Sequence, residues 1–264
     1  MYLNKCPIGV FDSGIGGLTV LKRLVQDYPN ENFIYIADYE YNPYGTKKRE
    51  EIESRVIKIG KYLEEQQCKV IIIACNTASI YAEKLQKVVK IPVISVIEPT
   101  VNLALSMTKN NRIGLLATDM TVNSNYYQNL IKNESAYVKA ISASPFVEII
   151  ESNTVDSNET DKIVYSIIKP LLSEKIDTLI YGCTHFELIH KPVYKYLKDI
   201  NYITSGIPVS KHLKSVLSVQ LNEQKSKGSI NIYSTSKIDD NLVNKIEIFN
   251  LKYDKIESIR GKIK

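Results

Sequence analysis

Long apolar runs, blocks of like charge and paired-cysteine motifs are all missing from this chain of 264 residues. Residues 70–75 form one of its longest apolar runs, far short of the ~20 residues that a helix needs to span a bilayer. The N-terminus reaches a glycine-rich turn at Gly14, which leaves no room for the apolar part of a signal peptide. We therefore expect a cytoplasmic protein with no membrane partner.

The charged residues are evenly mixed, so they give no nucleic-acid footprint. Lys and Arg number 34 against 29 Asp and Glu, a net charge of +5, and runs such as residues 47–51 contain both signs. We read these charges as a solvated surface and expect no nucleic-acid partner. Hydrophobic residues at 44% and charged residues at 24% are ordinary globular usage, which excludes disorder and fibrous repeats. The length allows two domains of about 100–150 residues each.

The four cysteines are Cys6, Cys68, Cys75 and Cys183, and no two of them form a Cys-x-x-Cys pair. That spacing is typical of zinc ribbons and redox motifs, so the sequence predicts no metal site of this kind. Structural disulfides are not expected in a reducing compartment. We read Cys6 and Cys68 as incidental, whereas the positions of the other two set them apart.

Short apolar runs alternate with helical patterns, which predicts an α/β fold with parallel sheets. The predicted strands are residues 8–11, 33–37, 70–74, 92–97, 113–117, 138–142, 178–181 and 202–205. The predicted helices are residues 18–28, 48–67, 77–89, 122–132, 161–175 and 209–223. A polar break at residues 224–228 precedes a C-terminal segment for which we expect one further strand and one helix.

Two stretches of the first half of the chain reappear in the second half. Residues 8–13 resemble residues 113–118, and residues 70–77 resemble residues 178–184, at nearly the same offset. Each echo alone is weak, because apolar strands resemble one another. Together they predict two similar α/β halves and place Cys75 and Cys183 at equivalent points.

Those two points suit a reaction that needs two bases. Each cysteine ends an apolar strand, and the carboxyl ends of strands in an open α/β sheet face the ligand. The following helix N-terminus favours thiolate over thiol. One such cysteine would more often be a simple core residue, but a matched pair favours function. A carbon acid between two thiols can lose a proton to one and gain a proton from the other, which inverts the stereocentre.

A glycine-rich loop, residues 12–17, follows the first strand and suits a small charged ligand. Asp12 at its start could orient or deprotonate a substrate ammonium group. The alternative is a dinucleotide site, with Asp38 after the second strand as the ribose-binding acid. Thr19 stands where that fingerprint requires its third glycine, so we disfavour this interpretation.

Other polar residues have both a functional and a structural interpretation. Residues 43–46 form a turn, or offer backbone N–H groups to a carboxylate. Thr118 and Thr121 cap a helix, or add hydroxyl donors to the same pocket. His185 is a core or capping residue, or assists Cys183 in proton transfer. Glu151 alone would be read as a solvated carboxylate.

These motifs resemble the glutamate racemase family of cofactor-independent racemases. The matching segments are residues 9–18 (GVFDSGIGGL), 43–46 (PYGT), 74–78 (ACNTA), 92–99 (PVISVIEP), 117–122 (ATDMTV) and 182–186 (GCTHF). Their order and spacing cover residues 8 to about 205, and the C-terminal segment also resembles the family's ending. The paired cysteine motifs together with the Asp-Ser-Gly loop are the specific part of the resemblance.

The resemblance implies a role for each matching residue. Cys75 would take the α-proton of the D-enantiomer and Cys183 that of the L-enantiomer. The matching auxiliary acid/base groups are Asp12, His185 and, after a one-residue shortening of the chain, Glu151. The matching substrate contacts are Asp12, Ser13, Tyr44, Gly45, Asn76, Thr77, Thr118, Thr121, Thr184 and His185.

The family also implies an architecture and a cellular role. We expect two pseudo-symmetric parallel-sheet α/β domains with the active site in the cleft between them, residues 1–97 plus 208–264 and residues 98–207. The implied reaction interconverts L- and D-glutamate without cofactor or metal and supplies D-glutamate for peptidoglycan in the bacterial cytoplasm. A homodimer is left open.

Two departures from the family pattern bear on substrate fit. Glu187 stands where the family usually has proline, and residues 39–42 are unusual before Pro43. A related racemase acting on aspartate or another amino acid is therefore the first alternative. A binding protein without catalysis is a weaker one, since it would not need both cysteines.

Overall fold

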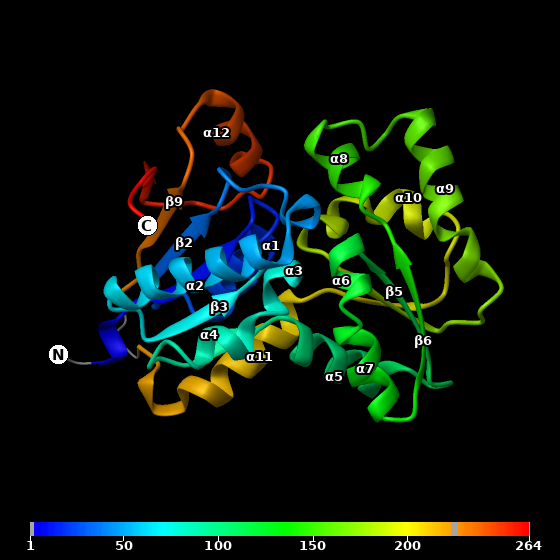
Figure 1. Cartoon of the computed structure of the whole chain (residues 1–264), viewed down its shortest axis with the longest axis horizontal. Coiled ribbons are helices and arrows are strands. Elements are labelled where there is room, and N and C mark those ends of the chain that lie inside the picture. The colour runs from blue at the N-terminus through cyan, green and yellow to red at the C-terminus, as the bar shows by residue number, and fades with distance from the viewer. Residues whose placement is uncertain (1–2, 223–225, 264) are drawn as a thin grey trace. The chain divides into compact units, whose positions relative to one another are not determined.

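The computed structural model describes residues 3–222 and 226–263, and the chain forms two compact units (Figure 1). One unit comprises Met1–Val96 and Gly206–Lys264, and the other comprises Ile97–Ser205. Each unit contains one sheet in which every strand pairs in parallel with its neighbours. The predicted α/β class with parallel sheets is confirmed.

The sheet of the first unit has the strand order β10-β9-β2-β1-β3-β4. Its strands are β1 (Ile8–Asp12), β2 (Phe33–Ala37), β3 (Val70–Ile73), β4 (Val93–Ser95), β9 (Ile230–Ser234) and β10 (Lys255–Ser258). The central strands β1, β2 and β3 are buried along their whole length, as expected for strands covered by helices on both faces. This explains why they read in the sequence as unbroken apolar runs rather than as alternating patterns.

The helices of the first unit connect these strands on both faces of the sheet. They are α1 (Leu18–Asp27), α2 (Arg49–Glu65), α3 (Asn76–Ser79), α4 (Ala82–Gln86), α11 (Gly206–Leu217) and α12 (Asp240–Glu247), with the short 3-10 helices η1 (Leu3–Lys5), η2 (Tyr44–Thr46) and η4 (Ser218–Gln220). Helix α1 packs against α11, and α2 packs against α4. The helix predicted over residues 77–89 is instead two short helices, α3 and α4.

The C-terminal segment differs from the prediction of one strand and one helix. It contains two strands, β9 and β10, separated by α12, and both extend the first sheet. Strand β9 pairs with β2 from Phe33↔Ile230 onward, which makes β2 an internal strand. The predicted helix over residues 209–223 and the predicted polar break both include positions among residues 223–225, which lie outside the described residues.

The sheet of the second unit has the strand order β6-β5-β7-β8. Its strands are β5 (Arg112–Ala117), β6 (Tyr137–Ser142), β7 (Thr178–Gly182) and β8 (Asn201–Ile203). Its helices are α5 (Ile97–Met107), α6 (Asp119–Asn123), α7 (Tyr126–Asn133), α8 (Pro145–Glu151), α9 (Asn158–Leu172) and α10 (His190–Tyr194), with the 3-10 helix η3 (Thr184–Ile189). The helix predicted over residues 122–132 is broken at Asn125, whose backbone is left-handed with φ of 57°.

The two sheets share one topology. The order β2-β1-β3-β4 of the first corresponds strand by strand to β6-β5-β7-β8 of the second. The register corresponds as well, because Ile8 pairs with Val70 in one sheet and Ile113 pairs with Thr178 in the other. The echo in the sequence therefore marks equivalent strands, and the two cysteines follow equivalent strands.

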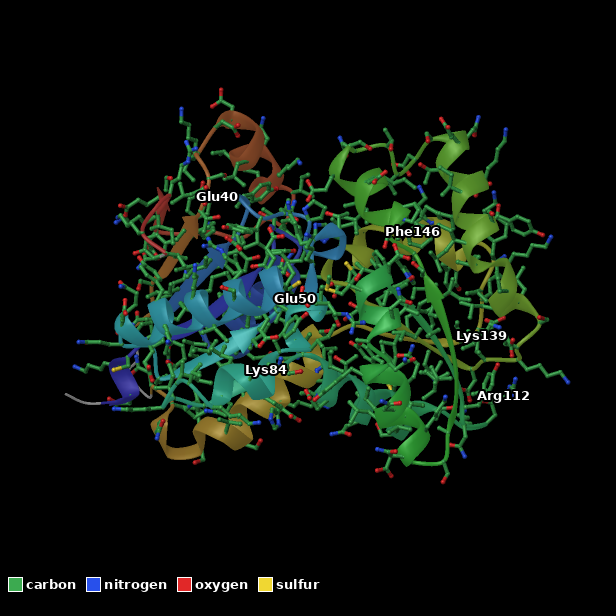
Figure 2. All side chains as sticks on the ribbon, viewed as in Figure 1. Glu40, Glu50, Lys84, Arg112, Lys139 and Phe146 are labelled. Carbon is green, nitrogen blue, oxygen red and sulfur yellow. The ribbon has the colours of Figure 1, made fainter. Side chains whose placement is uncertain are left out.

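Each unit contains ion pairs that join separate segments of the chain. In the first unit Lys69 Nζ lies 2.6 Å from Glu31 Oε2, and both side chains are almost completely buried. Breaking such a pair by removing one partner costs about 3–5 kcal/mol, because the other charge stays buried. In the second unit Arg112 and Lys139, labelled in Figure 2 on adjacent strands, both bind Glu174 at 3.2 and 3.4 Å. Among the described residues, no helix combines the length and apolarity needed to cross a bilayer.

Candidate active site

Cys75 and Cys183 occupy equivalent places in the two units. Cys75 follows β3 and is the N-cap residue of α3, and Cys183 follows β7 and is the N-cap residue of η3. Neither is in a disulfide with another described cysteine, and 6% and 9% of the two residues is exposed. Each sulfur therefore lies at the carboxyl edge of its sheet, beside the N–H groups that begin a helical turn.

The loop of residues 12–17 lies beside Cys75. Asp12 ends β1, is fully buried, and accepts a hydrogen bond from the Gly14 backbone N–H at 3.0 Å. The Ser13 hydroxyl lies 3.8 Å from the Cys75 sulfur. Gly17 is required here, because a Cβ at this position would lie 2.6 Å from the Asp12 Cβ. The first unit thus brings together Cys75, Ser13 and Asp12, three of the residues that the family resemblance places at the site.

Tyr35 fixes this loop from the neighbouring strand. Its hydroxyl donates to the Gly14 carbonyl at 2.8 Å. Burial raises the pKa of Tyr35 well above its ordinary value of 10.0, and the nearby Asp12, Tyr39 and Cys75 raise it further. The phenol therefore stays a neutral donor to this loop. Sequence reasoning missed this residue, since Tyr35 reads as one of several buried strand positions.

The second predicted loop, residues 43–46, forms η2, and its one fully buried side chain is Tyr44. The Tyr44 hydroxyl donates to Asp38 Oδ2 at 2.5 Å. Burial raises the pKa of Tyr44 well above 10.0, and the charge of Asp38 adds to this shift. Gly45 follows it and is half-buried. Asn76 and Thr77, the first two residues of α3, are both 3% exposed.

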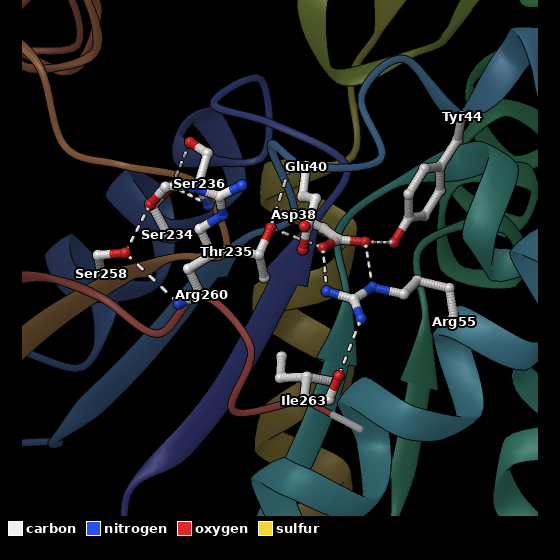
Figure 3. A network of polar contacts seen from close by, with 10 residues as sticks. All are labelled: Asp38, Glu40, Tyr44, Arg55, Ser234, Thr235, Ser236, Ser258, Arg260 and Ile263. Carbon is white, nitrogen blue, oxygen red and sulfur yellow. Dashed lines mark hydrogen bonds and ion pairs between the residues drawn. The ribbon is translucent and has the colours of Figure 1, made fainter.

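Asp38 does not fit the alternative role of a ribose-binding acid. Its side chain is fully buried and is surrounded by donors from Tyr44, Arg55 and Thr235 (Figure 3). No carboxylate oxygen is left exposed for a sugar hydroxyl. Sequence reasoning missed Arg55, although its position offered a signal: it lies on the buried stripe of α2 between Ile52 and Val56, where a charge needs a partner.

In the second unit a chain of polar contacts leads away from Cys183. The Cys183 sulfur lies 3.8 Å from His185 Nδ1, and His185 Nε2 lies 3.1 Å from Glu151 Oε1. His185 is 3% exposed. An ionised Glu151 can only accept, which places a proton on Nε2 and leaves Nδ1 of a neutral imidazole able to accept the thiol proton. The structure therefore adds Glu151, which only the resemblance implied, to the pair of Cys183 and His185 that the sequence had already suggested.

Aromatic packing positions this chain. Glu151 is the last residue of α8, and His185 and Phe186 lie in η3. The rings of Phe146, on α8, and Phe186 meet edge to face with centroids 5.4 Å apart, and Phe146 is labelled in Figure 2. Both rings belong to the same apolar cluster as Cys183. The packing of η3 on α8 thus sets the imidazole against the carboxylate.

The local contacts of Thr118 and Thr121 agree with the capping interpretation. Thr118 is the N-cap of α6, and its hydroxyl accepts from the Thr121 backbone N–H at 3.4 Å. The two hydroxyl oxygens lie 3.0 Å apart. Thr184, the first residue of η3, is 7% exposed.

The two departures from the family pattern lie close to these loops. Asn42 lies against Gly14, with its Oδ1 3.3 Å from where a Cβ on that glycine would stand. Glu187 follows the cysteine motif in η3, where its charge acts on Tyr181. Burial, then Tyr202 and Glu187, raise the pKa of Tyr181 well above 10.0. Within residues 3–222 and 226–263, no three His, Cys, Asp or Glu side chains are grouped as metal ligands.

Comparisons with known proteins agree with these motifs. The profile of the Asp/Glu/Hydantoin racemase family matches residues 18–209. A glutamate racemase of Bacillus cereus is 36% identical over 244 residues, 90% of each chain. A glutamate racemase of Neisseria meningitidis serogroup C is 40% identical over 215 residues, 80% of each chain. The crystal structure of glutamate racemase from Francisella tularensis in complex with D-glutamate is 36% identical, with a TM-score of 0.90 over 97% of this chain and 98% of that one.

Proposed function

Because this chain belongs to the Asp/Glu/Hydantoin racemase family, we propose that it is an isomerase that interconverts L-glutamate and D-glutamate. The observation that carries the proposal is the equivalence of Cys75 and Cys183. They follow topologically equivalent strands, in the same register, at the carboxyl edges of two sheets. A binding protein has no need for a matched pair of thiols, whereas racemisation needs two groups that exchange a proton with one carbon.

The reaction balances with these two thiols alone. In the D-to-L direction the Cys75 thiolate takes the α-proton, and the electron pair of the C–H bond stays on the substrate as a carbanion delocalised into the carboxylate. The Cys183 thiol then gives its proton to the opposite face of the same carbon. Cys75 ends as the thiol and Cys183 as the thiolate, and the L-to-D direction starts from that state.

Auxiliary groups prepare each thiol for its step. Asp12 acts beside Cys75 and orients or deprotonates the substrate ammonium group. His185 acts beside Cys183, and Glu151 holds the imidazole by the 3.1 Å contact at Nε2. The contacts of Ser13 with Cys75 and of His185 with Cys183, both 3.8 Å, support these assignments.

The remaining candidate residues bind the substrate in this proposal. They are Ser13, Tyr44, Gly45, Asn76, Thr77, Thr118, Thr121 and Thr184, all of which lie in loops or first helical turns that follow strands. Backbone N–H groups at such turns suit carboxylates, and glutamate carries two. We also propose the domain division of residues 1–97 plus 208–264 and residues 98–207, which the two compact units support.

One experiment tests the reaction directly. Purified protein is incubated with L-glutamate in deuterium oxide, while circular dichroism follows optical activity and NMR follows the α-proton. We expect the optical signal to decay to zero and the α-proton to be replaced by deuterium. D-glutamate should give the mirror-image decay. A signal that stays constant with both enantiomers would refute the proposal.

The same assay separates the alternatives. L-aspartate is one methylene shorter, so a pocket built for glutamate should turn it over at least about tenfold more slowly. Faster turnover of aspartate would identify the related racemase instead, with Glu187 and Asn42 as the first residues to examine. Binding of glutamate without α-proton exchange would identify a binding protein.

The cellular role follows the reaction. D-glutamate made by this enzyme would enter peptidoglycan, in the cytoplasm of a bacterium, and the family relationship supports that role. Growth of a depletion strain only when D-glutamate is supplied would test it. We propose that the chain acts without a nucleic-acid or membrane partner, and a homodimer would be detected by light scattering of the purified protein.

A further inference from the structure

A buried polar network surrounds the carboxylate of Asp38, at the carboxyl end of β2 (Figure 3). Its Oδ2 accepts from the Tyr44 hydroxyl at 2.5 Å and from Arg55 Nε at 2.8 Å. Its Oδ1 accepts from Arg55 Nη2 at 2.6 Å and from the Thr235 hydroxyl at 2.8 Å. All four hydrogen bonds reach one fully buried group, so the carboxylate is fixed in place by three separate chain segments.

Arg55 is held as firmly as its partner. Its guanidinium lies over the Tyr41 ring, 4.4 Å from the centroid, and its Nη1 donates to the Ile263 carbonyl at 3.3 Å. The side chain of Arg55 is 5% exposed. The fork of the guanidinium thus connects α2, the segment before Pro43 and the C-terminal residues of the described chain.

The same network touches both loops of the proposed site in this unit. Through its backbone N–H, Asp38 donates to the Asp12 carbonyl at 2.9 Å. Through its carboxylate it holds Tyr44, whose ring is the one fully buried side chain of η2. Neither Asp38 nor Arg55 belongs to the substrate contacts proposed above. Asp38 binds one of those contacts, Tyr44, directly, and Arg55 acts on it through Asp38.

A second buried ion pair in this unit lacks these connections. Lys69 and Glu31 are as deeply buried as Asp38 and Arg55, but their further hydrogen bonds run to Asn4, Gln220 and Asn222. Those residues lie at the opposite, amino-terminal edge of the sheet. A buried ion pair is weak evidence for stability, so its location is the informative property.

We infer that Asp38 and Arg55 are a positioning pair that fixes Tyr44 and the loop of residues 43–46, and so sets the affinity for a substrate carboxylate. This inference rests on the proposed function. The pair makes no contact with the reacting carbon and takes no part in proton transfer. The pair strengthens binding of the substrate and of the transition state equally. Its loss should therefore raise KM and leave kcat unchanged.

The test compares Asp38→Asn with Glu31→Gln in the full chain. An amide has one acceptor oxygen and two N–H donors. In Asp38→Asn the N–H group would therefore face a donor of Tyr44, Arg55 or Thr235 and could not accept its hydrogen bond. We expect its KM for glutamate to rise about tenfold, the size of one charge-assisted hydrogen bond, with kcat within about twofold. Glu31→Gln should leave KM unchanged, although urea unfolding should show that both variants are destabilised.

Two further measurements show whether Asp38 acts through Tyr44. Tyr44→Phe removes the hydroxyl alone, and in the double variant with Asp38→Asn the rise in KM should be smaller than the product of the two single effects. Because the equilibrium constant of a racemisation is one, kcat/KM must fall equally for both enantiomers in every variant. If Asp38→Asn does not fold, Thr235→Val removes one of the four hydrogen bonds and should raise KM about threefold.

The outcomes separate this inference from the proposed function. Wild-type protein that fails to racemise glutamate overturns the function and the inference with it. If the wild-type protein is active but folded Asp38→Asn keeps the wild-type KM, the inference alone is overturned. The same applies to Thr235→Val where it replaces Asp38→Asn. The inference is also overturned when KM rises equally in Glu31→Gln, or when kcat falls instead of KM rising.

Discussion

The imidazole of His185 and the carboxylate of Glu151 are joined by a 3.1 Å contact between Nε2 and Oε1. The two residues come from η3 and α8 and are 34 positions apart in the chain. The contact leaves Nδ1 facing the Cys183 sulfur at 3.8 Å. A carboxylate behind a histidine fixes the ring's tautomer and orientation, which is what a base that assists a thiol requires.

We predict that Glu151→Gln lowers kcat/KM for both enantiomers on the order of tenfold. The amide can still hold the imidazole, but it also offers an N–H donor and carries no charge, so the tautomer with Nδ1 free is no longer enforced. Circular dichroism with L- and D-glutamate measures the effect. The matched control is Glu148→Gln on the exposed face of the same helix, which should retain wild-type rates. Equal rates in the two variants would contradict the assignment of Glu151.

We predict that Cys75→Ala and Cys183→Ala each reduce racemisation by at least about a thousandfold. Either change removes one of the two proton-transfer groups, so inversion cannot be completed at the α-carbon. Both buried thiols stand at the first turns of helical segments, and their replacement by the smaller Ala should leave the fold intact, as measured by far-UV circular dichroism. Substantial turnover in either variant would refute the two-base mechanism.

The control for these variants is Cys68→Ala. Cys68 is also a buried free thiol, and burial raises its pKa to about 12. A thiol of that pKa is protonated at neutral pH, so its removal should cost about 1 kcal/mol of stability and leave turnover within about twofold. A loss of activity equal to that of the other two variants would show that cysteine loss acts through the fold.

Much of the central architecture could be predicted from the sequence, because buried parallel strands leave a strong signal. Strands β1, β2, β3, β5 and β7 are near-continuous apolar runs, and each was predicted within a residue or two of its bounds. Helices α5, α8 and α10 were missed. Each carries a proline in its first turn, at Pro99, Pro145 and Pro192, where a missing N–H breaks no helical bond.

The strands β9 and β10 show a different reason for failure. Their burial alternates or is partial, and strand β10 has no fully buried residue among those described. Short, half-exposed strands of this kind are stabilised by pairing with β2 and β9, a tertiary effect that local patterns do not contain.

In the candidate site, too, local sequence motifs could be predicted and tertiary contacts could not. Residues within sequence motifs, such as Cys75 and Ser13, were predicted and lie together. The residues that hold the motifs in place were not, because Tyr35 and Arg55 are single side chains without a spacing rule. Glu151 was proposed only through the family resemblance, and its contact with His185 depends on the packing of α8 against η3.

We predict that removal of metal ions leaves the activity unchanged. The proposed steps use two thiols, an imidazole and carboxyl groups, and these supply every proton that the reaction moves. Protein dialysed against a chelator, with no pyridoxal phosphate added, should keep its kcat and KM. The control is the same dialysis followed by addition of magnesium or zinc. Activity that is lost on dialysis and restored by a metal would overturn this prediction.

The carboxylate of Asp177, the residue before β7, contributes to stability through several hydrogen bonds. Asp177 accepts hydrogen bonds from the Thr108 hydroxyl at 2.6 Å and from the backbone N–H groups of Lys109 and Asn110 at 2.6 and 2.9 Å. Partial burial raises the pKa of Asp177, but these bonds and one from Thr178 outweigh it and hold the pKa below its ordinary value of 3.8. The carboxylate thus ties the turn after α5 to the strand that carries Cys183.

The sign of the resulting pH dependence is fixed. In the unfolded chain Asp177 binds a proton at a higher pH than in the folded chain. Its contribution to stability is therefore present above its ordinary pKa of 3.8 and is lost as the pH falls through its lower, folded-state pKa. At neutral pH we predict that Asp177→Asn lowers the free energy of unfolding by about 1–3 kcal/mol, and that its deficit relative to wild type shrinks as the pH falls below about 4. Urea unfolding from about pH 7 to about pH 3.5 measures this difference. Thr108→Val removes one of the hydrogen bonds and should show a smaller deficit with the same trend. A deficit that stays constant across this range would contradict the proposed charge at Asp177, because only an ionised group loses its contribution on protonation.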